Sequence, residues 1–254
     1  MSKTESGKRW LKAELHAHCS LDPIDYPVCR YSAEELICHA AELGYEVLAI
    51  TCHDVNVWTE GLSEFAGNLG ITLIPGMEIT TELTRHALVY NFDAAVEDLA
   101  TLKKIRSRSS ENTLVVAPHA FFPGRSCLRN LLKENLDVFD AIEYSGFQVR
   151  GLNFNRLSKS IAEKANKPMV GSGDIHYLWQ LNRTFAWIYS EPEVISILRA
   201  VKRGRVKLET SPLSWPEAAG WWTTTIWRKA PSLRSRQWPE RISRAPFVRP
   251  GHTP

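Results

Sequence analysis

The stretch ELHAHC at residues 14–19 follows a short apolar run, and TCHD at 51–54 and GDIH at 173–176 follow runs of the same kind. Short apolar runs of this type are typical of buried strands. Residues two apart in a strand point to the same side, so His16 and His18 can direct both imidazoles at one cation, about 7 Å apart along the strand. The three stretches together predict a metal site at the carboxyl ends of several strands.

Six of the eight histidines lie at or just beyond apolar runs of this kind. Composition gives no reason for such placement, so the clustering favours a shared site over isolated core or surface histidines. The six are His16, His18, His53, His86, His119 and His176. His39 falls in a helical pattern and His252 in the C-terminal tail. Asp174 and His176 repeat the two-residue spacing after the Gly-punctuated run 168–173, so both are also of ligand type.

Apolar runs alternate with helical patterns along the body of the chain. The expected strands are 11–16, 46–51, 72–75, 86–91, 113–118, 141–144, 169–171 and 184–189, and the expected helices are 32–43, 56–68, 94–107, 127–135, 152–165 and 191–202. Ser32 and Glu35 have the spacing of a capping box. Strand and helix in strict succession predict parallel βαβ units, and this many of them predict a closed or nearly closed α/β barrel. Ligand-type residues at many strand ends favour a barrel over a doubly wound sheet, which periodicity alone leaves open.

Length and composition set the class of protein. The chain has 254 residues and 44% apolar content, enough for one large α/β domain with an appendage. No apolar stretch approaches the roughly 20 residues that span a bilayer, and the polar start has no signal-peptide core, so we expect a cytoplasmic protein without a membrane segment. The five cysteines include no CxxC pair, which argues against a disulfide framework and a zinc-thiolate site. Cys19 and Cys52 flank proposed ligands, and packing beside the site is expected more than ligation.

The charge of the chain is unevenly distributed. Residues 211–254 carry seven Arg or Lys and two Glu, a net charge of +5, whereas residues 1–210 carry 24 basic and 26 acidic residues. We therefore divide the chain into a metal-site barrel over 1–210 and a basic Trp/Pro/Arg-rich extension over 211–254, expected to be irregular. A nucleic-acid arm is the alternative for this extension, because Trp and Arg can contact bases and phosphates. An unselected extension from a shifted reading frame is another. The charge of the body does not indicate nucleic acid.

Seven motifs stand in an order that resembles the PHP (polymerase and histidinol phosphatase) domain hydrolases, particularly the small stand-alone metal-dependent phosphoesterases. The motifs are LHAHCSLD, AITCHD, IPGMEIT, RHALVY, APHA, IEYSG and GSGDIH, followed by EVISILRAVKRGRV. The resemblance covers roughly residues 10–208. It implies a distorted seven-stranded (β/α) barrel that binds up to three divalent metal ions.

The resemblance also implies nine metal ligands in three groups. The first group is His16, His18, Glu78 and Asp174; the second is Glu78 with His86 and His119; the third is Asp22, His53 and His176. A bridge between two cations needs an anion with two oxygens, which suits Glu78. Imidazoles suit zinc, manganese or iron, so two to three of these ions are the expected cofactors.

Three positions leave alternatives open within this resemblance. Asp25 competes with Asp22, which better matches the family's spacing after the first two histidines. Glu143 matches a recurrent family position, with a structural role and ligation equally expected. Cys52 stands where many members of the family have Asp, so a supporting hydrogen bond is absent and the third ion is expected to bind weakly.

The expected activity is metal-dependent hydrolysis of phosphate esters, either small phosphomonoesters or nucleotide ends. Bound metal lowers the pKa of water, and a metal pair stabilises the attacking and leaving oxygens. Glu78, beside a metal-activated hydroxide, and Asp174 are the expected catalytic residues. Arg183 is a candidate contact for the substrate phosphate, and Arg125 and Arg150 are weaker candidates for that contact.

Two other classes of function remain as alternatives. Amidohydrolase-like barrels cleave C–N bonds and usually have a Lys at a strand end, and the body has none at such a position. The other alternative is a non-catalytic, metal-stabilised nucleotide- or nucleic-acid-binding module. The fold does not determine the identity of the phosphate ester, and the sequence leaves the oligomeric state unknown.

Overall fold

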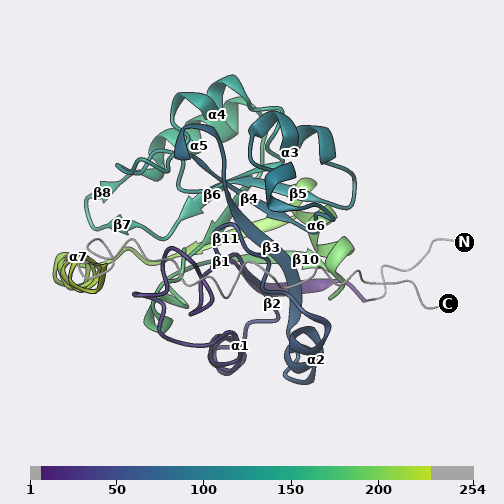
Figure 1. Ribbon diagram of the computed structural model, residues 1–254, viewed down its shortest axis with the longest axis horizontal. Coiled ribbons are helices and arrows are strands. Elements are labelled where there is room, and N and C mark those ends of the chain that lie inside the picture. Colours follow the sequence, from purple (N-terminus) through teal and green to yellow (C-terminus); the bar gives the residue numbers. More distant parts are fainter. Residues whose placement is uncertain (1–6, 230–254) are drawn as a thin grey trace, which may run out of the picture.

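A nine-stranded sheet, curled into a nearly closed barrel with helices around it, forms the body of the protein (Figure 1). The structure is a computed structural model that describes residues 7–229. The strand order is β11-β10-β1-β2-β3-β4-β5-β6-β9, and a separate hairpin pairs β7 with β8. The strands are β1 Arg9–Ala17, β2 Val47–Ile50, β3 Thr72–Thr80, β4 His86–Tyr90, β5 Leu114–Ala117, β6 Ala141–Ser145, β7 Gln148–Val149, β8 Leu152–Asn153, β9 Met169–Ser172, β10 Thr184–Ser190 and β11 Val206–Thr210.

Each predicted helix of the body overlaps a shorter helix of the structure, and α3 extends one residue beyond its predicted end. The α-helices are α1 Ala33–Glu42, α2 Glu60–Asn68, α3 Leu102–Arg108, α4 Asn130–Glu134, α5 Asn155–Lys164, α6 Val194–Lys202 and α7 Trp215–Lys229, and the 3-10 helices are Glu82–Thr84, Val96–Asp98 and Leu178–Gln180. The predicted capping box before α1 is confirmed, because Ser32 and Glu35 exchange side-chain-to-backbone hydrogen bonds. Of the helices within residues 7–229, none is long and apolar enough to cross a bilayer.

The prediction of an all-parallel arrangement is wrong for half of the strand pairs of the large sheet. β1–β2, β2–β3, β5–β6 and β6–β9 are parallel, whereas β3–β4, β4–β5, β1–β10 and β10–β11 are antiparallel. The chain reverses between β3 and β4 over a single short 3-10 turn, in which Leu83 and Thr84 have positive φ angles. A turn of this length allows only antiparallel pairing, because a parallel crossover needs about a dozen residues.

The expected count of seven strands is also not matched. Seven strands run from β1 round to β9, and a bridge between Ala17 and Ile175 joins the two ends at the mouth. β10 and β11 add two antiparallel strands beside β1. β11 was missed because its polar sequence, Val206–Thr210, is partly or fully exposed along its length and lacks an apolar run.

Gly171 allows β9 to come close to β10 and β11, so that the two ends of the sheet nearly meet. A Cβ at this position would lie 2.5 Å from the carbonyl oxygen of Phe185 in β10 and would overlap Leu208 of β11. Only a residue without a side chain permits such a close backbone approach. The position of β9 matters for the site, because Asp174 follows this strand.

The barrel interior is apolar away from the mouth. Its core includes alternate residues of β1 (Leu11, Ala13 and Leu15) with Val47 and Ala49 of β2, and α6 packs against the same cluster. Two further clusters lie under α1 and α2 and under α3 to α5. This packing fixes the strands whose carboxyl ends carry the histidines.

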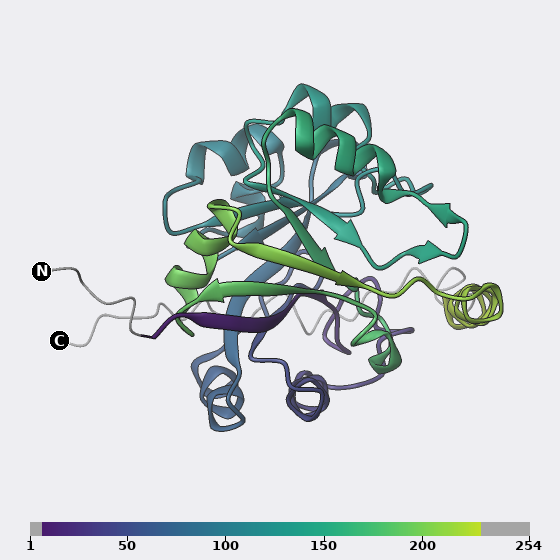
Figure 2. The ribbon, with the colours of Figure 1, turned by 180° about the vertical axis from the view of Figure 1, so that it is seen from behind.

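The expectation of an irregular tail is wrong for residues 215–229, which form α7. Ser214 accepts from the backbone N–H of Glu217, and the Glu217 carboxylate accepts from Ser214, so the helix has a capped start. Pro216 is compatible with a first helical turn. α7 lies at the same end of the barrel as the carboxyl end of β1 (Figures 1 and 2). Residues 230–254 of the predicted extension lie outside the described residues.

Candidate metal centre

All six strand-associated histidines meet at the mouth of the barrel. His16 lies in β1 and His18 just beyond it, His53 follows β2, His86 begins β4, His119 follows β5 and His176 follows β9. Glu78 lies in β3, and Asp174 follows β9. The structure therefore brings together every histidine and acid predicted as a ligand. Arg183 is the predicted site residue that it does not bring there.

The carboxylate of Glu78 lies at the centre of the cluster. Its Oε1 is 2.6 Å from His86 Nδ1 and 3.0 Å from His119 Nε2. Its Oε2 is 3.2 Å from both His16 Nε2 and His53 Nε2 and 3.4 Å from His18 Nε2. Glu78 is 1% exposed, so this contact of five imidazoles with one carboxylate is shielded from water.

Asp174 is the second carboxylate shared between imidazoles. Its Oδ1 lies 3.2 Å from His18 Nε2 and 3.4 Å from both His16 Nε2 and His176 Nδ1. His16 and His18 thus both reach the same oxygens of Glu78 and Asp174, as expected for side chains two apart in a strand. Asp174 has a φ of 50°, a backbone conformation that non-glycine residues seldom adopt.

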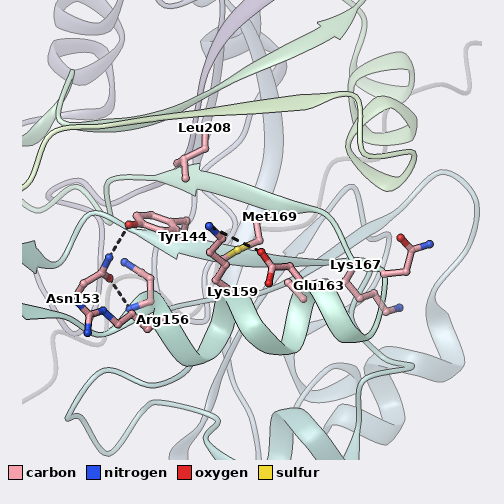
Figure 3. Close-up of a pocket in the computed structure, with 11 residues that line it drawn as sticks. Tyr144, Asn153, Arg156, Lys159, Glu163, Lys167, Met169 and Leu208 are labelled. Atoms are coloured by element: carbon pink, nitrogen blue, oxygen red, sulfur yellow. Dashed lines mark hydrogen bonds and ion pairs between the residues drawn. The ribbon is translucent and has the colours of Figure 1, made fainter.

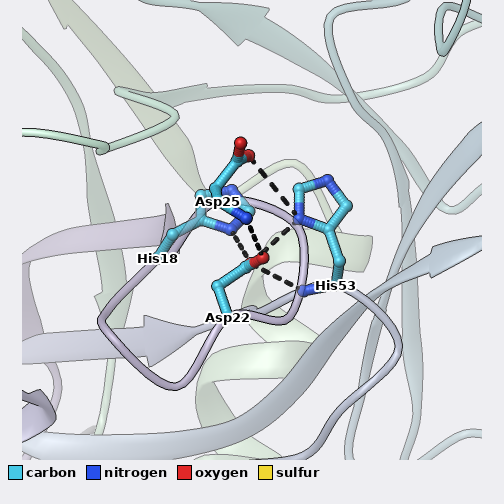
Figure 4. A group of neighbouring side chains, drawn as sticks. All are labelled: His18, Asp22, Asp25 and His53. Carbon is cyan, nitrogen blue, oxygen red and sulfur yellow. Dashed lines mark hydrogen bonds and ion pairs between the residues drawn. The ribbon is translucent and has the colours of Figure 1, made fainter. Parts of the chain in front are cut away.

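Asp22 lies behind His18 and His53 rather than between their Nε2 atoms (Figure 4). Its Oδ2 is 2.7 Å from His18 Nδ1, 2.9 Å from His53 Nδ1 and 2.8 Å from the backbone nitrogen of His53. Its Oδ1 accepts two backbone N–H groups in the same loop. Asp22 therefore orients both rings so that each Nε2 faces Glu78, as carboxylates do behind metal-bound histidines.

Asp25 also belongs to the cluster, although the sequence favours Asp22 at this motif. Asp25 Oδ2 lies 2.8 Å from His176 Nε2 and 3.7 Å from His53 Nδ1. Of the third predicted group, Asp22 and His53 are in contact, whereas His176 contacts Asp25 and Asp174.

Two further buried glutamates support the ligand-bearing strands. Glu143 accepts from His16 Nδ1 at 2.8 Å and from the backbone N–H of His119. It thereby supports His16 from the side opposite to Glu78. Glu14, which sequence reasoning missed, accepts from the backbone N–H groups of His16 at 2.9 Å and Gly173 at 3.0 Å. The available signal was a carboxylate inside the otherwise apolar run before the first histidine.

The donor atoms fit a group of divalent ions. Four ligands about 2.1 Å from one ion in a tetrahedral site lie about 3.4 Å from each other, and octahedral neighbours lie about 3.0 Å apart. The Nε2 atoms of His16 and His18 lie 3.2–3.4 Å from the nearest oxygens of Glu78 and Asp174. These separations match those between ligands that face shared ions. Several overlapping groups of three or four donors meet this spacing.

Burial and opposite charges shift the pKa values of these groups in opposing directions. Burial alone would lower the pKa of His18, but hydrogen bonds to Asp174 and Asp22 outweigh it and raise the pKa to about 10. Burial would raise the pKa of Glu78, but the neighbouring His86, His53 and His16 hold it well below its usual range. Without metal, His18 is therefore protonated and Glu78 is ionised at neutral pH.

Metal binding is expected to release protons and to strengthen as pH rises. His18 has a raised pKa in the metal-free fold, so its stabilising pairing is complete below about pH 6.5 and is lost as pH rises through about 10. An incoming ion must displace these protons. We expect about one proton or more released per ion, measurable by calorimetry in buffers of different ionisation enthalpy.

The same reasoning predicts that the stability of the metal-free protein depends on pH and that the stability of the metal-loaded protein does not. The chelator-treated protein should lose resistance to urea between pH 6.5 and 9.5, and the metal-loaded protein should keep it. Metal binding without proton release would contradict this assignment of protonation.

The two cysteines beside the ligands pack against each other. Cys19 and Cys52 are both buried, and their Sγ atoms are 3.6 Å apart. They belong to the apolar cluster under α1 and α2. All five cysteines are free thiols in the structure.

The predicted phosphate-binding arginine pairs with α7 rather than with the histidine cluster. Arg183 forms an ion pair with Glu217 of α7, and among the described residues no hydrogen bond or ion pair joins it to the cluster. Arg125 and Arg150 are exposed. The contacts of Arg183 are those of a residue that fastens α7 to the barrel.

A separate cavity of about 520 Å³ lies on the flank of the barrel, between α5 and the strands β6, β9 and β11 (Figure 3). Arg156, Lys159 and Lys167 give it a basic rim, and Met169 and Leu208 lie at its apolar side. Lys159 is 3.9 Å from Glu163, which partly balances this charge. None of the residues lining the cavity belongs to the histidine cluster.

Two solved structures share this architecture. A two-domain protein from Bacteroides vulgatus ATCC 8482, described as containing a predicted PHP-like metal-dependent phosphoesterase, aligns with a TM-score of 0.60 and 18% identity over 81% of this chain and 66% of that one. This chain therefore spans just under two thirds of its length. PsfC from Pseudomonas syringae PB-5123 aligns with a TM-score of 0.55 and 15% identity over 87% of this chain and 99% of that one.

At these identities the likeness establishes the fold. No protein-family model and no curated protein matches the sequence. The nearly closed barrel and these two structures nonetheless confirm the expected α/β barrel fold. The chain therefore has a PHP-like fold.

Proposed function

We propose that this protein is a metal-dependent phosphoesterase. The observation that carries the proposal is the buried Glu78 carboxylate, whose two oxygens are shared by five imidazoles, with Asp174 beside it. A carboxylate with two oxygens among several imidazoles suits a group of cations at the mouth of the barrel. The description of the Bacteroides structure as a PHP-like metal-dependent phosphoesterase is consistent with it.

We assign two to three divalent ions to the cluster, with zinc, manganese or iron favoured by the imidazole-rich donor set. The proposed ligands are His16, His18, His53, Glu78, His86, His119, Asp174 and His176. Asp22, the ninth residue predicted as a ligand, is assigned instead to orienting His18 and His53. When bound, the ions would supply an activated water and neutralise charge on the phosphoryl oxygens.

The protein's own groups position this chemistry. Glu78 and Asp174 provide the negative charge that holds the cations, and we assign them the catalytic roles. Glu143 and Asp22 fix the rings of His16, His18 and His53 through the nitrogens on their far sides. We assign Arg183 to the attachment of α7 and not to the substrate. The proposed substrates are small phosphomonoesters or nucleotide ends.

The test is metal analysis together with turnover. Protein purified without chelator should contain two to three transition-metal equivalents and should hydrolyse a generic aryl phosphate ester in the presence of manganese. Chelation should abolish turnover, and added manganese should restore it. Bound metal without turnover would contradict the proposal and favour a binding module.

A further inference from the structure

Helix α7 lies against three loops that follow barrel strands at the mouth. The contacts join Phe147 to Trp221 with ring centroids 4.7 Å apart, Tyr177 Oη to Thr225 Oγ1 at 3.2 Å, and the Val28 carbonyl to Arg228 Nη1 at 3.0 Å. Val28 lies in the loop after β1, Phe147 follows β6, and Tyr177 is the neighbour of His176. The helix therefore borders the entrance to the histidine cluster.

Four aromatic side chains form a continuous row along this border. Ring centroids are 5.1 Å apart between Phe154 and Phe122, 5.2 Å between Phe122 and Phe147, and 4.7 Å between Phe147 and Trp221. We call these four residues the aromatic row. Each of them is partly exposed, so part of each residue is accessible to a ligand.

The aromatic row begins next to the metal ligands. The backbone N–H of Phe122 donates to the carbonyl of His119 at 3.0 Å, which fixes the turn between them. Phe147 follows Gly146, and a Cβ on Gly146 would lie 3.0 Å from the carbonyl oxygen of Gly173, the residue before Asp174. The row is thus tied by its backbone to two loops that carry ligands.

The end of the row on α7 carries a donor without a partner among residues 7–229. Trp221 Nε1 is buried and has no hydrogen-bond acceptor within the described part of the chain. Arg228 Nε, on the same helix, is buried in the same condition, although its Nη1 is bonded to Val28. A buried N–H group without an acceptor is unfavourable, so these atoms are suited to oxygen atoms of a ligand.

From these observations we propose that the aromatic row is a subsite for the leaving group of the substrate, and that it selects esters whose leaving group carries a flat aromatic ring. This inference rests on the proposed phosphoesterase function. A flat ring can stack on the accessible faces of Phe147 or Trp221, whereas a puckered ring of equal size packs on them less favourably. Stacking of this kind is expected to favour the aromatic ester about fivefold to tenfold.

Two esters with the same reacting bond isolate this effect. 2-Phenylethyl phosphate and 2-cyclohexylethyl phosphate have primary alcohols of similar size as leaving groups and differ in the flatness of the ring. We expect wild-type kcat/KM to favour the phenyl ester about fivefold to tenfold, and the ratio to fall to about one in Trp221→Leu. Trp215→Leu is the matched control, because Trp215 is exposed on the same helix and has no ring contact with the row. It should keep the wild-type ratio.

The ratio is independent of the folded fraction, because both esters are measured on one preparation. If Trp221→Leu does not fold, Phe147→Leu should show the same loss of preference. A wild-type ratio of about one would overturn the subsite, and so would an unchanged ratio in these variants.

A binding measurement separates failure of the subsite from failure of the proposed activity. Calorimetry with 2-phenylethylphosphonate and 2-cyclohexylethylphosphonate reports the preference without turnover. Preferential binding of the phenyl compound, lost in Trp221→Leu, together with no hydrolysis of either ester, would support the subsite and refute the phosphoesterase. Equal binding of the two phosphonates would overturn the subsite whether or not the esters are hydrolysed.

Discussion

Replacing Glu78 with glutamine is expected to lower kcat/KM for a phosphate ester by on the order of 10³-fold and to remove at least one metal equivalent. The side chain keeps its size, but one of its two oxygens becomes an NH₂ group. In the wild type, Oε1 contacts His86 and His119. Oε2 contacts the imidazoles of His16, His18 and His53. An amide has no negative charge, and its NH₂ group can neither accept a hydrogen bond nor bind a cation.

The measurement combines elemental analysis with steady-state kinetics on Glu78→Gln. Glu111→Gln is the matched control, because Glu111 is exposed and forms no hydrogen bond or ion pair within the described residues. The control should keep full metal content and activity. Wild-type activity in Glu78→Gln with an unchanged metal content would remove the central argument for the site.

The position of the metal centre could be predicted because its physical basis is local. The side-chain period of a strand puts His16 and His18 on one side, and parallel strands bring their carboxyl ends to one edge. These two rules suffice to bring the first histidine pair to Asp174. Placing Glu78 and His86 also required the family resemblance, since nothing in an isolated run states that β3 and β4 pair.

Strand direction could not be predicted in the same way. Whether β4 returns antiparallel to β3 depends on the backbone conformation of Leu83 and Thr84, which both adopt positive φ angles against their usual preference. β11 escaped detection because a partly solvated strand at the end of the sheet order needs no apolar run. In both cases the pairing between strands determines the structure, and the periodicity of apolar residues in the sequence does not show this pairing.

The acids and the arginine around the site show a further limit on sequence reasoning. Asp22 and Asp25 are separated by two residues in one loop, and only the folded loop shows that both reach histidines. Arg183 follows His176 closely in the sequence, which makes it a candidate for the site. Its partner, Glu217, lies 34 residues further along in a helix that the Trp- and Thr-rich sequence concealed. The charge of a residue is visible in the sequence, but its partner is not.

Replacing Gly171 with valine is expected to lower the free energy of unfolding by about 3 kcal/mol or more. The new Cβ alone would lie 2.5 Å from the carbonyl oxygen of Phe185, and that atom belongs to the backbone of β10. A flexible side chain could move aside, but a hydrogen-bonded strand must shift as a whole. A change of this size corresponds to a melting temperature about 6–12 °C lower for a domain of this length.

The effect should extend to the metal centre, because Gly171 and Asp174 are three residues apart on one segment. Moving β9 away from β10 would displace Asp174 from His16 and His18, so Gly171→Val should also bind less metal than the wild type at equal protein concentration. Gly67→Ala in α2 is the opposite case, because a Cβ there meets nothing within 4 Å. That variant should gain about 0.5–1 kcal/mol from helix propensity. Equal stability of the two variants in urea unfolding would show that β9 does not need this close approach to complete the barrel.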